Sequence, residues 1–336
     1  MPLALPRFAG FRSRRRRLLA GAAAGLTVLG LLLWWLLPLG RPEPEGPLTF
    51  STGGRSGVYH LYGELLQEAL TRDLPQVDVA LLPSEGSQQN LERVATGAAD
   101  FTIATADAVS KYKMDDRPGA DRLRGCARLY DDYVQLVVPA DSRVDSVRDL
   151  KGLRVGIGQP ASGVRLISER LLTAAKLDPA TDITPVSIGI DQMPAQLEAG
   201  RIDAFIWSGG LPTNAVKELS ERTDIRLVQL GDMIKELQRS GTPARYYRSA
   251  VISPDTYKWA RSNDDVTTLA VPNLLVTTDR TDAALTEGLT RTVIDNRDRI
   301  GHQVHAAQLV DLRTAIYTDP LELHEGAARY YRSAKP

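Results

Sequence analysis

The sequence predicts an α/β protein with two similar lobes, and three observations predict it. A pattern occurs twice, in LERVATGAADFTIATAD (91–107) and in QLEAGRIDAFIWSGG (196–210), and each copy indicates the end of a helix, a glycine, an aspartate and a short apolar strand. Candidate strands and helices alternate along most of the chain, as they do in a sheet covered by helices. The length of 336 residues accommodates two lobes of roughly 100 to 150 residues each.

The repeated pattern also predicts where a site lies. Aligning Gly97 with Gly200 places Asp100 beside Asp203, and we interpret both aspartates as turn residues rather than site residues. The strand that follows ends in small and polar residues in each copy, ATAD and SGG. Ligands of open α/β sheets bind at the carboxyl ends of strands, so we predict a ligand cleft between the lobes.

The amino terminus predicts a membrane anchor. Residues 1–17 form a basic tail, and Leu18 to Leu37 is an uncharged apolar run of twenty residues, long enough to span a bilayer as a helix. The arginine cluster predicts a cytoplasmic tail and a single-pass protein of the cell membrane with its carboxyl-terminal domain outside. No small-x-small cleavage site follows the run, which favours an uncleaved anchor. Residues 38–47 form a Pro-rich linker.

Charge and cysteine content exclude several classes. Without the six arginines of the tail, 35 basic residues face 41 acidic ones, which is no basic footprint for nucleic acid. The one cysteine, Cys126, has no partner for an internal disulfide and is interpreted as a buried apolar residue. The histidines are isolated and no metal-binding motif is present, so we expect neither a metal nor another cofactor.

The elements of the first lobe follow from hydrophobic periodicity. The expected order is strand 48–51, a Gly-rich turn, helix 58–69, strand 77–82, a helix in which Ser87 caps the amide of Asn90, the first repeat copy and the buried strand 134–138. We place the first crossing between lobes after residue 138, in the polar turn 141–151.

The second lobe repeats the alternation. The expected order is strand 154–157, helix 164–175, strand 186–188, helix 193–199, strand 204–207, a helix to residue 221 and strand 226–230. Residues 231–265 receive no assignment. A long strand at 266–277, interrupted by Pro272, predicts the return crossing, and helices at 282–296 and after 304 complete lobe 1. Lobe 1 is therefore 48–138 plus 272–336, and lobe 2 is 139–271.

Four loops are candidates for ligand contact, namely TGGRSG, SEGSQQN, ATAD and GQPASG. Three of them lead into helices, whose free amides suit a carboxylate or phosphate. Arg55, or Arg165 one step inside its helix, could bind a carboxylate with both guanidinium nitrogens. Each loop taken alone is equally compatible with a tight turn or a helix cap. The loops indicate a site because all four are expected to face one cleft.

No enzyme motif is present. The sequence has no GxSxG nucleophile elbow, and TGGRSG lacks the Lys-Ser/Thr ending of a phosphate-binding P-loop. None of the four histidines stands beside a candidate nucleophile. We therefore do not expect a catalytic residue.

The order of six blocks resembles the TAXI family of solute-binding proteins from TRAP transporters. The blocks are TGGRSGVYHLYGELL, SEGSQQNLERVATGAADFTIATAD, VQLVV, DLKGLRVGIGQPASGVR, GRIDAFIWSGGLPTNAV and VPNLLVT, and the resemblance covers roughly residues 48–296. It implies a type II periplasmic-binding-protein fold, two α/β lobes joined by crossing strands that close on a ligand. It also implies capture of glutamate, glutamine or a related dicarboxylate and delivery to a TRAP membrane permease driven by an ion gradient.

The resemblance further implies ten ligand-binding residues. Together with Arg55, the expected site is made of Gly54, Tyr59, Ser87, Asn90, Asp107, Gln135, Ser162, Gly163, Trp207 and Gly210.

Three features depart from the family. The family usually has a small residue where Arg55 stands, which implies a more acidic or differently placed anion. Its GxGSGT-like loop reads PASGV here, with Ala161 and Val164 in place of Gly and Thr, and this removes a hydroxyl donor. A membrane anchor replaces the usual cleaved signal.

The expected function is that of an extracytoplasmic solute receptor. One alternative is a ligand-sensing adaptor for a membrane signalling partner, which a neighbouring histidine kinase gene would favour over a permease gene. A further alternative is an enzyme on the same scaffold, because fold does not fix function.

Overall fold

The computed structural model describes residues 27–28, 43–239, 241, 245–262 and 264–334. The chain divides into the units Met1–Glu43 and Pro44–Pro336, and the account below concerns the second. The predicted tail and the predicted anchor lie outside the described residues, apart from Thr27 and Val28. Within the described residues, no helix combines the length and the apolar composition that crossing a membrane requires.

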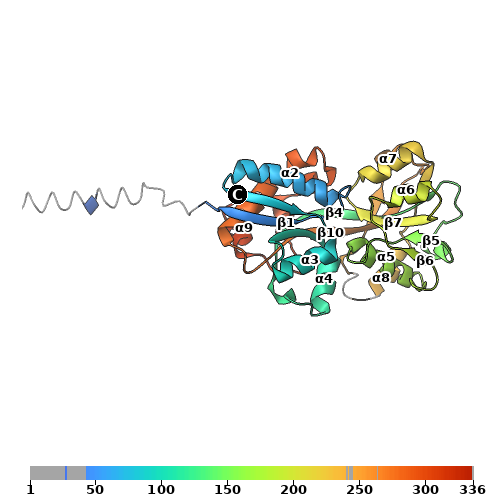
Figure 1. The fold of residues 1–336 in the computed structure, drawn as a ribbon, viewed down its shortest axis with the longest axis horizontal. Coiled ribbons are helices and arrows are strands. Elements are labelled where there is room, and N and C mark those ends of the chain that lie inside the picture. The colour runs from blue at the N-terminus through green and yellow to red at the C-terminus, as the bar shows by residue number, and fades with distance from the viewer. Residues whose placement is uncertain (1–26, 29–42, 240, 242–244, 263, 335–336) are drawn as a thin grey trace, which may run out of the picture. The chain divides into compact units, whose positions relative to one another are not determined.

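Ten strands form one continuous sheet that serves two lobes (Figure 1). The strands are β1 (Gly46–Ser51), β2 (Val77–Leu82), β3 (Phe101–Thr105), β4 (Leu123–Pro139), β5 (Arg154–Gly156), β6 (Thr184–Val186), β7 (Ala204–Gly209), β8 (Ile225–Val228), β9 (Arg248–Ile252) and β10 (Val266–Thr278). The first lobe has the order β2-β1-β3-β10-β4 and the second has β6-β5-β7-β4-β8. The two orders are equivalent. In the first lobe β10 stands between β3 and β4, and in the second lobe β4 stands between β7 and β8. In each lobe the strand at this place is one that also belongs to the other lobe.

Helices cover both faces of each half of the sheet (Figure 1). In the first lobe α2 (Val58–Asp73), α9 (Ala283–Asp295) and α12 (Glu325–Ser333) lie on one face, and α3 (Ser87–Thr96) and α4 (Ala106–Met114) lie on the other. In the second lobe α6 (Met193–Glu198) and α7 (Asn214–Arg222) lie opposite α5 (Gly163–Ala174) and α8 (Met233–Arg239). The shorter helices are α10 (Arg297–Gly301), α11 (Leu312–Ala315), η1 (Ala120–Arg122), η2 (Val147–Leu150), η4 (Pro254–Tyr257) and η5 (His305–Leu309).

Two long antiparallel strands connect the lobes. β4 pairs through residues 123–128 with β10 in the first lobe and through residues 133–139 with β7 and β8 in the second. The first crossing therefore lies inside β4, earlier than the predicted boundary after residue 138. The prediction missed this because Asp131 and Asp132 interrupt the apolar pattern of the strand. β10 pairs with β9 up to Ala270 and with β3 from Asn273.

The repeated pattern forms the same local structure in both lobes. The amide of Thr49 in β1 donates to Oδ2 of Asp100 at 2.7 Å, and the amide of Asp100 donates to the carbonyl of Thr49 at 2.9 Å. Arg154 in β5 and Asp203 make the same pair at 2.8 Å in both directions. Each aspartate thus joins the start of one parallel strand to its neighbour, which agrees with a structural role.

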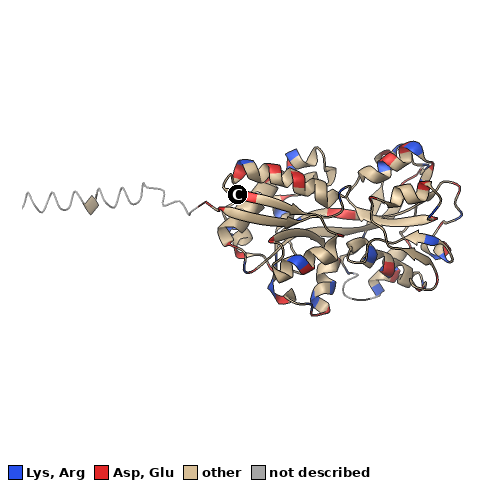
Figure 2. Cartoon of the chain, in the orientation of Figure 1, with Lys and Arg blue, Asp and Glu red and all other residues tan. Residues whose placement is uncertain are grey.

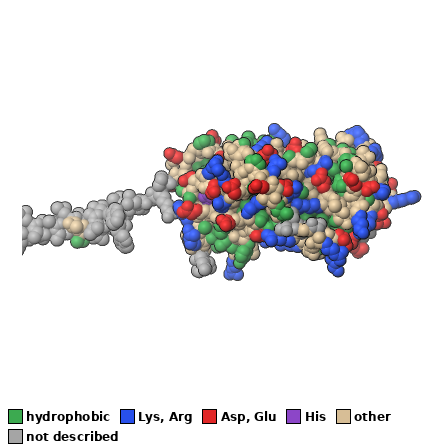
Figure 3. Space-filling model, turned by 90° about the horizontal axis from the view of Figure 1, so that it is seen from below, with side chains coloured by type: hydrophobic (Ala, Val, Ile, Leu, Met, Phe, Trp, Pro, Cys, Tyr) green, Lys and Arg blue, Asp and Glu red, His purple; other side chains and the backbone are tan. Residues whose placement is uncertain are grey.

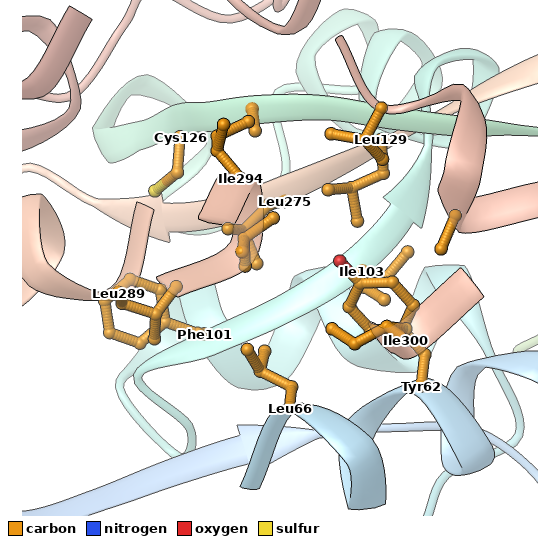
Figure 4. Close-up of a cluster of buried hydrophobic side chains, with 14 of the residues drawn as sticks. Tyr62, Leu66, Phe101, Ile103, Cys126, Leu129, Leu275, Leu289, Ile294 and Ile300 are labelled. Carbon is orange, nitrogen blue, oxygen red and sulfur yellow. The ribbon is translucent and has the colours of Figure 1, made fainter. Parts of the chain in front are cut away.

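Large apolar side chains fill the first lobe between the sheet and its helices. Figure 4 shows Phe101 and Ile103 of β3 beside Leu66 of α2 and Leu289 of α9. Cys126 of β4 lies in the same cluster and is fully buried, and this burial raises the pKa of its thiol well above the ordinary range. The thiol is therefore a buried apolar group in this fold.

Two segments differ from the sequence-based expectation. Gly46 and Pro47, expected in the linker, belong to β1 and pair with Val77 and Asp78 of β2. The unassigned segment 231–265 contains α8, β9 and η4 among its described residues. Among the described residues β9 pairs with β10 alone, so its formation depends on a long-range contact rather than on a local pattern.

We predict that Asp100→Ala and Asp203→Ala each lower the free energy of unfolding by about 0.5–1.5 kcal/mol, because each removes the acceptor of a main-chain amide in the neighbouring parallel strand. Urea denaturation monitored by circular dichroism measures this loss. The control variants Asp100→Asn and Asp203→Asn keep an acceptor oxygen and are expected to recover most of the stability. Loss in only one lobe would contradict the equivalence of the two pairs.

Candidate functional site

A cleft lies between the lobes and leaves a cavity of about 60 Å³. This is several times the roughly 10–15 Å³ that one water needs, so the space suits a small solute. Residues from all four candidate loops line it, including Gly54, Ser87, Thr105 and Ser162. The loop Gly189–Asp191 and the end of β7 complete the wall.

Six of the eleven expected site residues line this cleft. They are Gly54, Tyr59, Ser87, Ser162, Gly163 and Trp207. The other five, Arg55, Asn90, Asp107, Gln135 and Gly210, do not line the cleft.

Helix amino termini surround the cleft. α2 begins after Gly57, α3 after Gly86 and α4 after Thr105, and no side chain caps any of the three. α5 begins after Ser162, whose hydroxyl accepts from the amide of Arg165 at 3.0 Å. Free amides and the helix dipole at such ends attract negative groups. α2, α3 and α4 therefore lack the side-chain cap that α5 has.

Ser87 has a different role from the expected cap. It is the first residue of α3, and its hydroxyl accepts from the amide of Thr105 at 3.2 Å. The same hydroxyl lies 3.3 Å from the hydroxyl of Tyr59, which donates to Oδ1 of Asn273. Burial raises the pKa of Tyr59, and the charge of Asp132 acts in the same direction. Tyr59 is therefore a neutral donor held in place by its partners.

Hydrogen bonds cross the cleft and hold the lobes together. The amide of Ala161 donates to Oε2 of Glu85 at 2.8 Å, and the amide of Gln89 donates to the carbonyl of Ala161 at 3.0 Å. Nε2 of Gln88 donates to the carbonyl of Ser162 at 2.7 Å. Ser56 donates to Asp191 through its amide at 2.9 Å and through its hydroxyl. The structure is thus a closed form of the two lobes.

The backbone conformation at this seam favours a glycine. Gly86 has a φ of +133°, which residues with a side chain rarely adopt. A Cβ at this position would be in ordinary contact with Ser162 of the other lobe, at 3.4 Å.

Asp107 also joins the lobes, but it does so behind the cleft wall. Its Oδ2 accepts from Arg170 of α5 at 2.8 Å and from the hydroxyl of Tyr247. The carboxylate is only 2 % exposed. A buried acid with two donors has its charge compensated within the protein, so Asp107 is placed as an interlobe contact rather than as a ligand contact.

Asn90 and Gln135 belong to buried networks. The amide group of Asn90 donates to the carbonyls of Thr52 and Ile103, and its oxygen accepts from Ser51 and Ser84. Its hydrogen-bonding capacity is used in joining α3 to β1 and β3.

The amide of Gln135 lies in the second lobe. Its Oε1 accepts from the hydroxyl of Tyr257 at 2.8 Å, and its Nε2 lies 3.4 Å from the hydroxyl of Thr213. The expected need of a buried amide for partners is therefore met by the protein itself.

Arg55 and Gly210 line a separate hollow of about 280 Å³ beside the start of α2. Arg55 is exposed to solvent. The other candidate arginine, Arg165, donates to Glu169 at 2.5 Å and to Ser187 at 3.0 Å. Neither arginine faces the cleft, and no lysine, arginine or histidine occurs among the described residues that line it.

Several cleft residues were not identified from the sequence. The most informative is Asp132 of β4, which is 3 % exposed and whose Oδ1 accepts from Nδ2 of Asn273 at 2.7 Å. Burial raises the pKa of Asp132 to about 7, and the charge of Asp107 contributes in the same direction. An acidic pair inside a long apolar strand, Asp131 and Asp132, is the pattern that indicates such a position.

Two hydroxyls in the cleft wall have no partner in the described structure. Oγ1 of Thr105 and Oγ of Ser208 are buried and form no hydrogen bond. Both residues line the cleft. Buried polar atoms without partners are costly, so these two oxygens are available to a bound molecule.

Charge is distributed differently inside and outside the cleft. Figure 2 shows acidic residues on the central part of β4, between the lobes. On the face seen in Figure 3, basic and acidic side chains are interspersed.

Among the described residues, no group of three or more His, Cys, Asp or Glu side chains is arranged to hold a metal ion.

Known structures share this fold. One is a protein from Bordetella bronchiseptica RB50, with 17% identity, coverage of 86% of this chain and 80% of that chain, and a TM-score of 0.50. Another is an ancestral arginine-binding protein bound to arginine, with 14% identity, coverage of 77% of this chain and 98% of that chain, and a TM-score of 0.51. A third is a putative L-cystine ABC transporter from Listeria monocytogenes, with 13% identity, coverage of 79% of this chain and 98% of that chain, and a TM-score of 0.50. At these identities the likeness concerns the fold, which is the α/β fold of periplasmic binding proteins.

The comparison with protein families extends over most of the chain. The model of the NMT1-like family matches residues 50–334, which include both lobes and every residue of the cleft. The chain therefore belongs to the NMT1-like family.

Proposed function

We propose that this protein is a solute receptor that encloses a small molecule between its lobes and delivers it to a membrane transporter. The observation that carries the proposal is the cleft itself, lined by both lobes and spanned by hydrogen bonds from Gln88, Gln89 and Glu85. Among the described residues, the chain passes between the lobes through β4 and β10, so rotation about these strands would open the cleft to solvent.

Closure is coupled to binding by simple thermodynamics. Each neutral hydrogen bond across the seam contributes about 0.5–1.5 kcal/mol, and the Asp107 contacts with Arg170 and Tyr247 also favour the closed form. A solute that touches both lobes binds the closed form better and shifts the population towards it. The proposed receptor therefore needs no covalent chemistry, and we propose that it is not an enzyme.

We propose a small solute with a carboxylate, such as glutamate, glutamine or a related acid. The uncapped amino termini of α2, α3 and α4 at the cleft support this class. Because the lining contains no basic side chain among the described residues, main-chain amides are the proposed partners of the carboxylate.

The membrane partner is proposed from sequence. Resemblance to the TAXI proteins supports delivery to a TRAP permease driven by an ion gradient, and a many-helix permease encoded beside this gene would agree with it. The apolar run Leu18–Leu37 supports anchoring in the cell membrane with the lobes outside. A neighbouring histidine kinase instead of a permease would contradict the transport role.

We predict that at least one amino acid or small carboxylate raises the melting temperature of the full-length protein by several degrees. Binding to the folded state alone contributes about 2.7 kcal/mol at 100 times Kd. The same solute is expected to change tryptophan fluorescence, because Trp207 lines the cleft. Trp207→Phe should remove that change, whereas Trp259→Phe should keep it because Trp259 is 65 % exposed. A broad screen without any thermal shift would contradict the proposal.

We predict that Gln88→Ala weakens solute binding about threefold to tenfold, because it removes a hydrogen bond of the closed form without altering the cleft lining. Isothermal titration calorimetry measures the change in Kd. Gln76→Ala is the matched control, since Gln76 is exposed at the start of β2, and it should leave Kd unchanged. Equal Kd values for the two variants would argue against closure.

We predict that Arg55→Ala changes Kd less than twofold, because Arg55 is exposed and lines a separate hollow. The measurement is calorimetry with the solute found in the thermal screen. A loss of tenfold or more would place Arg55 in the binding site after all.

A further inference from the structure

Asp132 lies at the floor of the cleft between the lobes. It belongs to the central part of β4, where its Cα pairs with that of Val271 in β10. Its carboxylate is 3 % exposed and lines the cavity.

The carboxylate is held in one orientation. Tyr59 donates to Oδ1 of Asn273, so the amide nitrogen of Asn273 is directed to Oδ1 of Asp132 at 2.7 Å. The second oxygen, Oδ2, has no hydrogen-bond partner among the described residues. One oxygen of Asp132 is thus fixed by the protein and the other remains free.

No positive side chain among the described residues compensates this charge. The neighbouring Asp131 forms ion pairs with Arg128, at 2.9 Å, and with Arg248. Successive side chains of a strand point to opposite faces, so these arginines lie on the face of β4 opposite to the side chain of Asp132. The ionisable groups that act on Asp132 are Asp107, Tyr59 and Tyr130, and none carries positive charge.

The other two acids of the cleft are already bonded. Glu85 accepts from the amide of Ala161, and Asp191 accepts from Ser56. Each of the three acids has one oxygen without a partner among the described residues, but Glu85 is half-buried and Asp191 is exposed to solvent, whereas Asp132 is buried. Asp132 is therefore the acid whose charge solvent screens least.

The unpartnered groups of the cleft match a protonated amine. An ammonium group has three donors and no acceptor. Oδ2 of Asp132 and the free hydroxyl oxygens of Thr105 and Ser208 are three acceptors in the same lining. The aromatic rings of Tyr59 and Trp207 in the wall also attract a cation.

We infer that Asp132 is the counter-ion of a protonated amine on the bound solute, and that the cleft selects amine-bearing solutes over plain carboxylic acids. This rests on the proposed receptor function. It narrows the solute class to amino acids and excludes simple dicarboxylates, since a second carboxylate would meet Asp132 without an intervening cation.

Matched solutes test the inference in the full-length protein. The pairs are L-glutamate with glutarate, L-glutamine with glutaramate, and L-leucine with 4-methylpentanoate, each titrated by calorimetry. In any pair that binds, the amine-bearing member is expected to bind at least 30-fold more tightly, and Asp132→Asn should remove that difference. If a deaminated acid binds as tightly as its amino acid, the inference is overturned while the receptor function stands. If no member of any pair or of the wider screen binds, the receptor function itself fails.

A second measurement needs no ligand. Asp132→Asn keeps an acceptor for Asn273 and removes a buried, uncompensated charge. Because burial raises the pKa of Asp132 to about 7, the wild-type carboxylate is charged and destabilising at pH 8 and largely protonated at pH 5. Asp132→Asn should therefore raise the melting temperature by several degrees at pH 8, and the gain should shrink at pH 5. The control Asp131→Asn, which weakens a paired acid, should lower it. An unchanged or lower melting temperature for Asp132→Asn at pH 8 would show that Asp132 is a structural residue, and the inference would fail.

Discussion

The antiparallel pairing of β4 with β10 is the constraint on which this structure depends. Each strand is long enough to belong to both lobes, and the hydroxyl of Thr268 adds a bond to the carbonyl of Val134 within the second lobe. The register shifts after Pro272, whose nitrogen has no hydrogen to donate. The ladder is therefore irregular where the lobes meet, and a second register shift follows between Leu275 and Val276. The residues that border this irregularity, Asp132 and Asn273, are also those at the floor of the cleft.

The polar groups around the cleft fall into two kinds. Those that hold the lobes together, such as Asp107, Glu85 and Gln88, have partners within the protein. Those that remain without partners, on Thr105 and Ser208, line the cavity. Buried polar groups are usually satisfied, and two of the four buried side-chain oxygens without a partner in the described structure lie in this lining, at a cost in stability. Such a cost is characteristic of sites whose missing partner is another molecule.

Much of the fold was predictable because its determinants are local. Helix periodicity, glycine stops and the repeated aspartate all act within a few residues, and the Gly97–Asp100 pattern folds in the same way as Gly200–Asp203. The cleft was predictable in outline because parallel strands bring their carboxyl ends to one edge. The side-chain partners were not. Asn90 and Gln135 look like ligand contacts in sequence, yet Thr52 and Tyr257, which satisfy them, are distant along the chain. Asp132 was overlooked because the extent of β4 depends on pairing with β10 rather than on its own pattern.

The equivalent strand orders have a consequence for how such a protein can change. The second lobe leaves the first through β4 and returns through β10, and these strands stand side by side, with Tyr133 opposite Ala270. The second lobe is therefore an insertion in the first lobe, and the two ends of the insertion pair with each other. This geometry tolerates replacement of the inserted lobe. Replacing the second lobe by that of a relative would exchange one wall of the cleft while Asp132, Asn273 and the first lobe keep their places. If the proposed receptor function holds, chimeras made at this junction offer a route to new solute preferences without redesign of the whole protein.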